Sequence, residues 1–206
     1  MSRHRLDFRT FAGRALLVVC CFLGGGCASY QGTATSADPS QIAREGHWLM
    51  VRGFPRVSQE KDHDCGAAAL AAVLEFWGRT ATPASVEATM GGRDERLRAG
   101  DLVAHARREG LRSYVFFGEM SDIVHELERG RPVIVGLGKA VSDKKALAHY
   151  EVVVGYEPKQ KRVLLLDPAL GFQVDSVEGF SEEWKRSKGV TIVTFLPTPE
   201  PRISAN

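Results

Sequence analysis

Apolar residues follow two different spacings along this chain, and the change from one to the other limits the fold more than any other feature. Leu70, Val73, Leu74 and Trp77 recur at intervals of three and four residues, which predicts a helix over 65–77. Later runs are short, rich in Val, Ile and Leu, and bounded by Gly, Pro or Asp, a pattern typical of strands. The expected helices are 65–77, one from Pro83 with Thr82 as its N-cap, 99–109 and 121–129, and the expected strands are 132–137, 150–156, 162–166 and 190–196.

The order of these elements predicts an α+β fold, with N-terminal helices packed on a C-terminal antiparallel sheet. Glu157 to Gln160 form a turn between two of the strands, so this pair is expected to be an antiparallel hairpin. A dinucleotide-binding fold would alternate strands with helices and place a Gly-rich loop after a strand, and the sequence does neither. The composition, 44% hydrophobic and 25% charged, allows one sizeable core.

Residues 1–26 have the composition of a secretion signal. Four arginines precede an apolar run over 15–23, and three glycines then lead to Cys27. The apolar run is too short to cross a bilayer at roughly 20 residues per helix. Small residues before a cysteine resemble a bacterial lipoprotein signal, which implies that Cys27 carries a lipid after cleavage. The alternatives are an uncleaved anchor and a conventional signal peptide cut near Ala28.

The rest of the chain divides into a tether, a folded unit and a tail. Residues 27–46 are small and polar and predict a flexible tether, 47–196 hold the expected helices and strands, and 197–206 form a Pro-rich tail. The formal charge of +2 comes from residues 1–26, where four arginines against one aspartate give +3. The −1 that remains gives no electrostatic reason to expect a nucleic-acid partner.

Cys65 is the one cysteine that follows Cys27 in the sequence. A secreted chain that used cysteines for stability would carry them in pairs, so a single thiol in an oxidising compartment suggests chemistry. Cys65 follows Asp64, a favoured N-cap, and the amide N–H groups of a first helical turn favour negative charge. This position predicts a lowered thiol pKa and a nucleophilic thiolate. The alternative is a buried structural cysteine.

The segment from Gln59 to Gly66 resembles the signature of the bacteriocin-leader-processing peptidases, the double-glycine cysteine peptidases of papain-like fold. The resemblance covers about residues 55–196. It implies a papain-like domain with Cys65 as the nucleophile and Gln59, six residues earlier, as a side-chain donor to the oxyanion. Gly66 would leave room for a substrate backbone beside the thiol.

The resemblance extends to a histidine that precedes an apolar strand, which here is His149 before the strand expected over 150–156. A thiol nucleophile needs a base, and rigid backbone would hold the ring of His149 in place. Asp167 comes eighteen residues later at the end of the next strand, where the hairpin can bring it beside the imidazole to fix the tautomer. The alternative for Asp167 is a turn residue before Pro168, without a catalytic duty.

Two properties of the family are not expected here. Other members continue into a membrane-spanning transporter and an ATP-binding cassette, whereas this chain ends at 206 with neither, so we expect no transport and no ATP use. The leader places the site outside the cytoplasm, which argues against a cytosolic double-glycine leader as the substrate.

No Cys or His pair has zinc spacing, and we expect no metal and no other cofactor.

The sequence therefore predicts an extracytoplasmic cysteine peptidase, held in the cell envelope by a lipid on Cys27 and facing the periplasm or the exterior, on the outer membrane in a Gram-negative cell. Its expected partner is a peptide or protein substrate. One alternative is a cell-wall peptide amidase or endopeptidase of the other papain-like lipoprotein family, which usually has Ser-Gly where this chain has Gly66-Ala67. The other is a catalytically silent peptide-binding protein.

The lipid anchor is tested by replacing Cys27. Cys27→Ser removes the acceptor of the lipid, so the variant is expected to leave the membrane fraction for the soluble fraction. Fractionation of cells that express the parent, the variant and a Cys20→Ser control, followed by immunoblotting, measures the change. A Cys27→Ser protein that partitions as the parent does would show that lipidation is not the anchor.

Overall fold

The computed structural model describes residues 32–89, 97–142 and 145–197. The leader 1–26, the lipidation candidate Cys27 and the tail from residue 198 lie outside the described residues. Within the described ranges, no helix is both long enough and apolar enough to span a bilayer.

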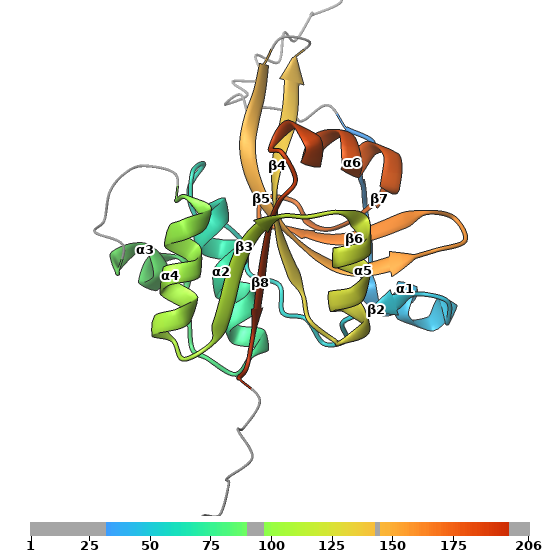
Figure 1. Ribbon diagram of the computed structural model, residues 1–206. Helices are drawn as coiled ribbons and strands as arrows, with labels where there is room; N and C mark the ends of the chain where they lie inside the picture. The colour runs from blue at the N-terminus through green and yellow to red at the C-terminus, as the bar shows by residue number, and fades with distance from the viewer. Residues whose placement is uncertain (1–31, 90–96, 143–144, 198–206) are drawn as a thin grey trace, which may run out of the picture.

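Eight strands form one sheet in which every pairing is antiparallel (Figure 1). The order across the sheet is β1-β7-β6-β5-β4-β8-β3, and the short β2 pairs with β5. This sheet, together with the helices beside it, confirms the α+β prediction. The strands are β1 Thr35–Ser36, β2 Leu49–Met50, β3 Arg112–Phe117, β4 Val133–Ser142, β5 Lys145–Glu157, β6 Arg162–Asp167, β7 Gly171–Ser176 and β8 Val190–Phe195.

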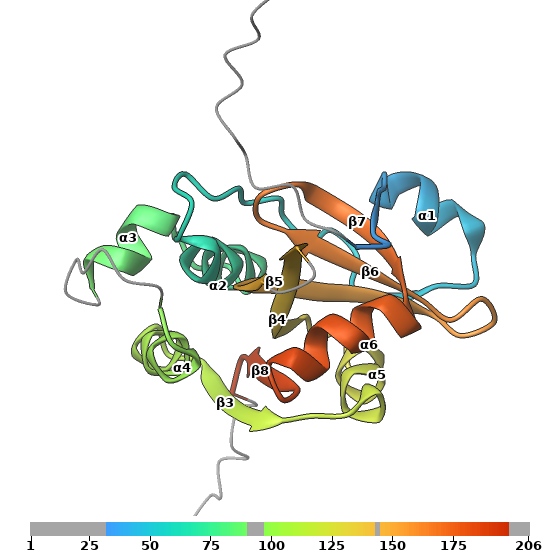
Figure 2. The ribbon, with the colours of Figure 1, turned by 90° about the horizontal axis from the view of Figure 1, so that it is seen from above.

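The helices lie in two groups around this sheet (Figures 1 and 2). Helices α2, α3 and α4 lie together on one side of the molecule, and α5 and α6 lie on the other. The four helices expected from the sequence are present as α2 to α5. The bounds are α1 Pro39–Glu45, α2 Cys65–Phe76, α3 Pro83–Ala88, α4 Ala99–Arg108, α5 Met120–Glu128 and α6 Val177–Arg186.

Helix α2 is buried on every face from Cys65 to Leu74. Five of these residues are alanines, and their small side chains let neighbouring elements approach closely. The helix packs against β5 as well as against α3 and α4. A helix without a polar face is stable only inside a protein, so α2 lies between the other helices and the sheet. This packing determines where Cys65 lies.

Strand β5 pairs with β4 along one edge and with β6 along the other. In these registers Leu137 lies opposite His149, and Val152 lies opposite Leu166. The antiparallel pairing of β5 with β6 across the turn after Glu157 confirms the expected hairpin. The end of β6 is thereby brought beside the middle of β5.

The segment 27–46, expected to be a flexible tether, is folded over part of its length. Thr35–Ser36 pairs with β7, and α1 begins at Pro39 after Asp38, whose side chain accepts from the Ser40 amide at 2.8 Å. Ile42 of α1 is 6% exposed and belongs to the core. A capped helix this short would not be stable alone, and it forms because the rest of the domain offers an apolar surface to Ile42. The folded unit therefore begins before residue 47.

Three longer elements, β3, β7 and α6, are not predicted by the sequence. In β7, polar Gln173 and Asp175 are buried, which interrupts the apolar pattern of a strand. Strand β3 lies at the edge of the sheet, and its residues 114–117 stay exposed. Half of the residues of helix α6 are charged, and Phe180 and Trp184 are buried. Strand β3 pairs with β8 and α6 packs on β4, both distant in the sequence, whereas β7 pairs with the preceding strand β6.

The packing of α1 is tested by Ile42→Ala. Loss of a buried isoleucine side chain is expected to lower the free energy of unfolding by about 2–4 kcal/mol, measured by urea denaturation. Gln41→Ala, at an exposed neighbouring position of the same helix, is the matched control and is expected to change it little. Equal stabilities of the two variants would show that this segment is a tether after all.

Candidate active site

Cys65 is the first residue of α2, and its thiol is buried and takes part in no disulfide. Only 3% of the residue is exposed. Asp64 occupies the N-cap position, as the sequence predicts, but its side chain does not cap the helix. Its Oδ2 instead accepts from the Glu60 amide at 3.0 Å and holds the preceding loop. The Asp64 carboxylate therefore does not accept from the first-turn amides of α2.

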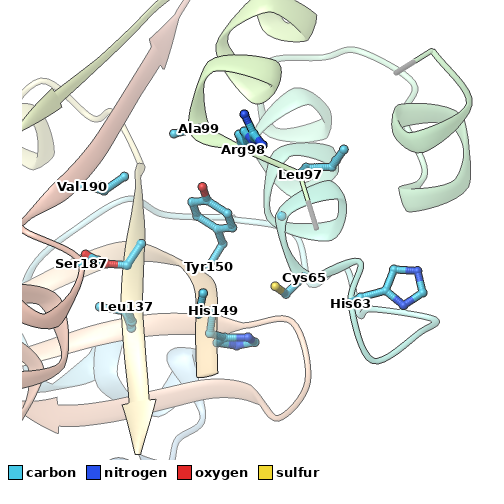
Figure 3. Close-up of a pocket in the computed structure, with 13 residues that line it drawn as sticks. His63, Cys65, Leu97, Arg98, Ala99, Leu137, His149, Tyr150, Ser187 and Val190 are labelled. Atoms are coloured by element: carbon cyan, nitrogen blue, oxygen red, sulfur yellow. The ribbon is translucent and has the colours of Figure 1, made fainter. Parts of the chain in front are cut away.

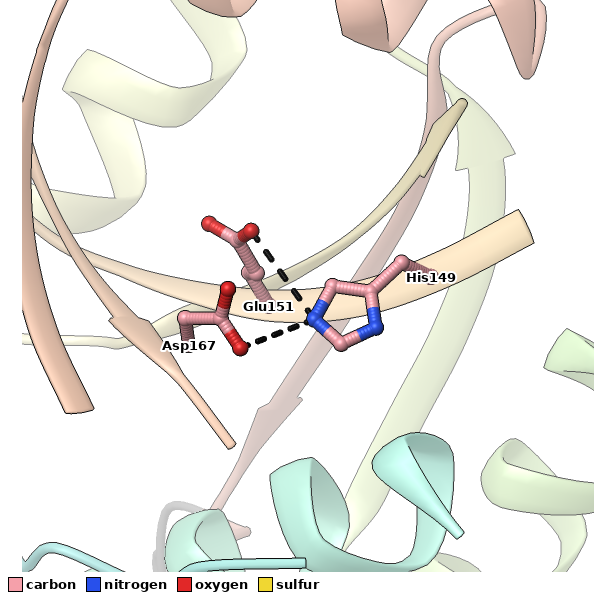
Figure 4. Close-up of side chains that lie close together, drawn as sticks. All are labelled: His149, Glu151 and Asp167. Carbon is pink, nitrogen blue, oxygen red and sulfur yellow. Dashed lines mark hydrogen bonds and ion pairs between the residues drawn. The ribbon is translucent and has the colours of Figure 1, made fainter. Parts of the chain in front are cut away.

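His149 and Asp167 are brought together by the pairing of β5 with β6 (Figure 4). Nε2 of His149 lies 2.9 Å from Oδ1 of Asp167, and both residues are buried. The same Asp167 oxygen accepts from the Ala169 amide at 2.7 Å, so backbone as well as imidazole holds the carboxylate. Because β5 extends back to Lys145, His149 lies inside the strand and not at its start. Asp167 is thus more than a turn residue.

His149 and Asp167 shift each other's pKa in opposite directions. Burial would lower the pKa of His149, but hydrogen bonds to Asp167 and Cys65 and the charges of Asp167 and Glu151 raise it to about 10. Burial would raise the pKa of Asp167, but the hydrogen bond from His149 and its positive charge hold it below its ordinary value. The imidazole therefore keeps its proton at neutral pH, with a carboxylate at Nε2 and the sulfur of Cys65 as its other hydrogen-bond partner.

Cys65 and His149 lie in the wall of a cleft of about 380 Å³ (Figure 3). Tyr150 also lines this cleft, and burial together with the charges of Cys65 and Asp101 raises its pKa to about 12, so the phenol stays protonated. A Cβ on Gly66 would come within 3.1 Å of the Tyr150 ring, so this glycine makes room for the ring. The other lining residues are mostly apolar: Leu97, Ala99, Gly136, Leu137, Ala148 and Val190, with His63, Arg98 and Ser187.

Gln59 lies in the loop before α2 and is half-buried. Its backbone N–H donates to the Pro168 carbonyl at 2.9 Å, which ties this loop to the turn that follows Asp167. Its side-chain Nε2 donates to the Lys61 carbonyl at 3.0 Å. An amide has two N–H hydrogens, and this bond uses one of them. The structure therefore joins Gln59 to the Asp167 turn through backbone, while its role at the oxyanion remains a prediction.

A buried ionic cluster behind His149 is not predicted by the sequence. Lys139 Nζ lies 2.8 Å from Glu151 Oε1 and 2.8 Å from Glu183 Oε2. Glu151 Oε1 lies 3.9 Å from Nε2 of His149. The signal that could have indicated this cluster is a glutamate, Glu151, inside an otherwise apolar strand, because a charge is rarely buried without a partner.

The donor atoms of His149, Glu151 and Asp167 lie within 4.8 Å of one another and could in principle hold a metal ion. The Lys139 ammonium already contacts Glu151 and brings a positive charge to these carboxylates. Nε2 of His149 is bonded to Asp167. The donor set is thus occupied by groups of the protein itself, and the described geometry fits proton chemistry better than metal binding.

The raised pKa of His149 predicts a pH dependence of stability. An unfolded histidine has a pKa of about 6.5. The protonated imidazole therefore stabilises the fold fully below that value, and this stabilisation is lost as the pH rises through about 10. The free energy of unfolding in urea is expected to fall more steeply over this window in the parent than in His149→Gln. If the free energy of unfolding falls with pH equally steeply in the parent and in His149→Gln, the raised pKa of His149 is contradicted.

Comparison with known proteins shows what this chain is similar to. A model of the peptidase C39-like family matches residues 51–192. An uncharacterized protein of Methanothermobacter thermautotrophicus is 30% identical over 115 residues, which are 56% of this chain and 72% of that protein.

Solved structures share the fold. The peptidase domain of Streptococcus ComA, a bifunctional ABC transporter involved in quorum sensing, is 23% identical with a TM-score of 0.58, over 70% of this chain and 99% of that one. A double glycine motif protease from an AMS/PCAT transporter, solved in complex with the leader peptide, is 23% identical with a TM-score of 0.58, over 72% of this chain and 97% of that one. These similarities confirm the papain-like fold. Since the family model spans more than half of the chain, including Cys65, His149 and Asp167, the chain belongs to the peptidase C39-like family and is a cysteine-type peptidase.

Proposed function

We propose that this protein cleaves peptide bonds with Cys65 as the nucleophile, His149 as the proton carrier and Asp167 as the residue that orients His149. The observation that carries the proposal is the chain of contacts from Asp167 through His149 to Cys65, with 2.9 Å between Oδ1 of Asp167 and Nε2 of His149. A silent peptide-binding protein would need neither this alignment nor a thiol beside it.

The raised pKa of His149 determines where the proton lies before the reaction. At neutral pH the imidazole is protonated, so the thiol proton resides on His149 and Cys65 reacts as the thiolate. Its sulfur forms a bond to the carbonyl carbon, and the C–N bond breaks as His149 gives its proton to the leaving amine. Water, deprotonated by His149, then hydrolyses the thioester and restores the thiol. Asp167 stabilises the imidazolium while it carries the proton.

Negative charge on the carbonyl oxygen requires hydrogen-bond donors. We propose Gln59 and a backbone N–H at the start of α2, where the Asp64 side chain caps no amide. Support for Gln59 comes from its place in the loop, which the Pro168 carbonyl ties to the Asp167 turn. The second hydrogen of its amide is the proposed donor.

The proposed substrate is a peptide or protein segment that lies in the cleft with an apolar side chain against Leu137, Tyr150 and Val190. The leader 1–26 and Cys27 support a location in the cell envelope, with the site outside the cytoplasm. In that location the substrate would be an envelope or extracellular peptide. Neither ATP nor nucleic acid has a part in this proposal.

Pre-steady-state acylation tests the mechanism. The full-length chain is mixed with an excess of a peptide ester that has an apolar side chain, and formation of the acyl-enzyme is followed by mass spectrometry. Cys65→Ala is expected to form none. Gln59→Ala is expected to react at least about a hundredfold more slowly with KM nearly unchanged, because its hydrogen bond strengthens only as the oxyanion forms.

Gln160→Ala, at an exposed turn position, is the matched control and is expected to react as the parent does. Acylation of Gln59→Ala at the parent rate would remove the oxyanion role of Gln59. A parent that forms no acyl-enzyme with any ester tested would favour a peptide-binding function over catalysis.

A further inference from the structure

The cluster of Lys139, Glu151 and Glu183 has no part in the mechanism above, although it lies directly behind His149. These residues come from β4, β5 and α6, and their side chains are only 6%, 1% and 7% exposed. Two contacts of 2.8 Å join the ammonium of Lys139 to the two glutamates. Burying a charged side chain lowers the stability of the fold unless the charge is paired, and pairing recovers only part of that loss. Stability alone therefore does not explain why these three charged residues lie in the core.

Glu151 connects the cluster to the catalytic histidine. His149 and Glu151 are two residues apart in β5, so their side chains leave the same face of the strand. Oε1 of Glu151 lies 3.9 Å from Nε2 of His149, the nitrogen that Asp167 contacts at 2.9 Å (Figure 4). Two carboxylates from neighbouring strands therefore face one N–H of the imidazole.

The balance of charges favours a proton on His149. Three carboxylates, Asp167, Glu151 and Glu183, face two cations, Lys139 and the His149 imidazolium. The described cluster thus has one negative charge in excess when all its members are ionised. In a site largely removed from water, such an excess stabilises the imidazolium more strongly than a surface charge would.

We propose that Glu151 is a positioning residue for the peptidase reaction: it shares Nε2 of His149 with Asp167 and stabilises the imidazolium, while Lys139 and Glu183 hold Glu151 in place. The inference rests on the proposed function, because His149 is the proton carrier there. Glu151 touches neither the thiol nor the cleft in this arrangement and acts through His149.

The charge of Glu151 changes within the working pH range. Burial raises the pKa of Glu151 to about 7, against the opposing effect of Lys139, while Asp167 raises it further and His149 lowers it. Glu183 of α6 lies on the other side of Lys139 from Glu151, and Cys65 of α2 lies on the other side of His149. Arg186 of α6 donates to the Gly138 carbonyl at 3.1 Å and not to the carboxylates of the cluster. Glu151 is therefore neutral at acid pH and negative where His149 begins to lose its proton.

This titration gives Glu151→Gln a specific signature. Gln resembles the protonated glutamate, so the variant is expected to retain the acid limb of the kcat/KM profile. Above pH 7 it lacks the negative charge, so the basic limb is expected to move to lower pH by about one unit or more. A residue that only supported the fold would lower activity at every pH without moving either limb.

The experiment measures kcat/KM against pH for the full-length parent, Glu151→Gln and Glu183→Gln, with the peptide ester used above. NMR titration of the His149 ring in the same proteins is the second measurement and needs no substrate. Glu183→Gln is the matched control, because it removes a buried carboxylate from the same lysine without removing the neighbour of His149. It is expected to lower stability and to shift the His149 pKa and the basic limb clearly less than Glu151→Gln does, because in the described cluster Glu183 is joined to His149 only through Lys139 and Glu151.

The outcomes separate this inference from the proposed function. An active parent whose basic limb and His149 pKa do not move in Glu151→Gln overturns the role of Glu151 and leaves the peptidase intact. A parent that does not acylate, but whose His149 pKa falls in Glu151→Gln, overturns the proposed function and supports the coupling of Glu151 to His149. If Glu151→Gln does not fold, the His149 resonances of the parent must show a second inflection near pH 7, and its absence overturns the inference.

Discussion

Antiparallel pairing of β5 with β4 and β6 places the charged groups of the site. The side chains of His149 and Glu151 leave one face of β5, and the pairing with β6 carries Asp167 to the same imidazole nitrogen. The pairing with β4 brings Lys139 to Glu151. Side chains alternate along a strand, so a shift of one residue in either register would turn these groups to opposite faces and dissolve the site.

Cys65, the proposed nucleophile, comes from a different layer of the fold. Helix α2 has no polar face, and its alanines let it lie close to β5, with Cys65 at the end nearest His149. The sheet thus carries His149 and Asp167, the proposed base and its carboxylate, and the helix carries the thiol. Because both partners are held in the core, the thiol and the imidazole meet with little freedom to move apart, which is the preorganisation that nucleophilic catalysis requires.

Burial and charge oppose each other throughout this site. Burial would lower the pKa of both His149 and Lys139, yet the carboxylates around them raise both. Apolar residues of similar size would fill the positions of Lys139 and Glu151 at less cost, so this cluster is a poor way to gain stability. We infer that its effect is on the protonation state of His149, and through it on the thiolate proposed for Cys65.

Local patterns were sufficient for much of the fold. Apolar spacing and capping residues predict α2 to α5 and four of the strands, and a strand-turn-strand pattern predicts the β5–β6 hairpin, because these signals act between residues close in the sequence. The same reasoning does not predict β3, β7 or α6, and it predicts a flexible tether for the segment that contains α1. A short capped helix becomes stable only when a distant surface covers a residue such as Ile42.

The sequence by itself singled out the residues proposed for the chemistry: a cysteine at the start of a helix, a histidine beside an apolar run and an aspartate at the end of the next strand. It gave no sign that Lys139 and Glu183, which belong to β4 and α6, would meet Glu151. Strand register and the packing of α6 determined that contact, and they also determined the pKa of His149. Electrostatic effects of this kind depend on distances of a few ångströms between residues far apart in the chain, and only the tertiary structure defines those distances.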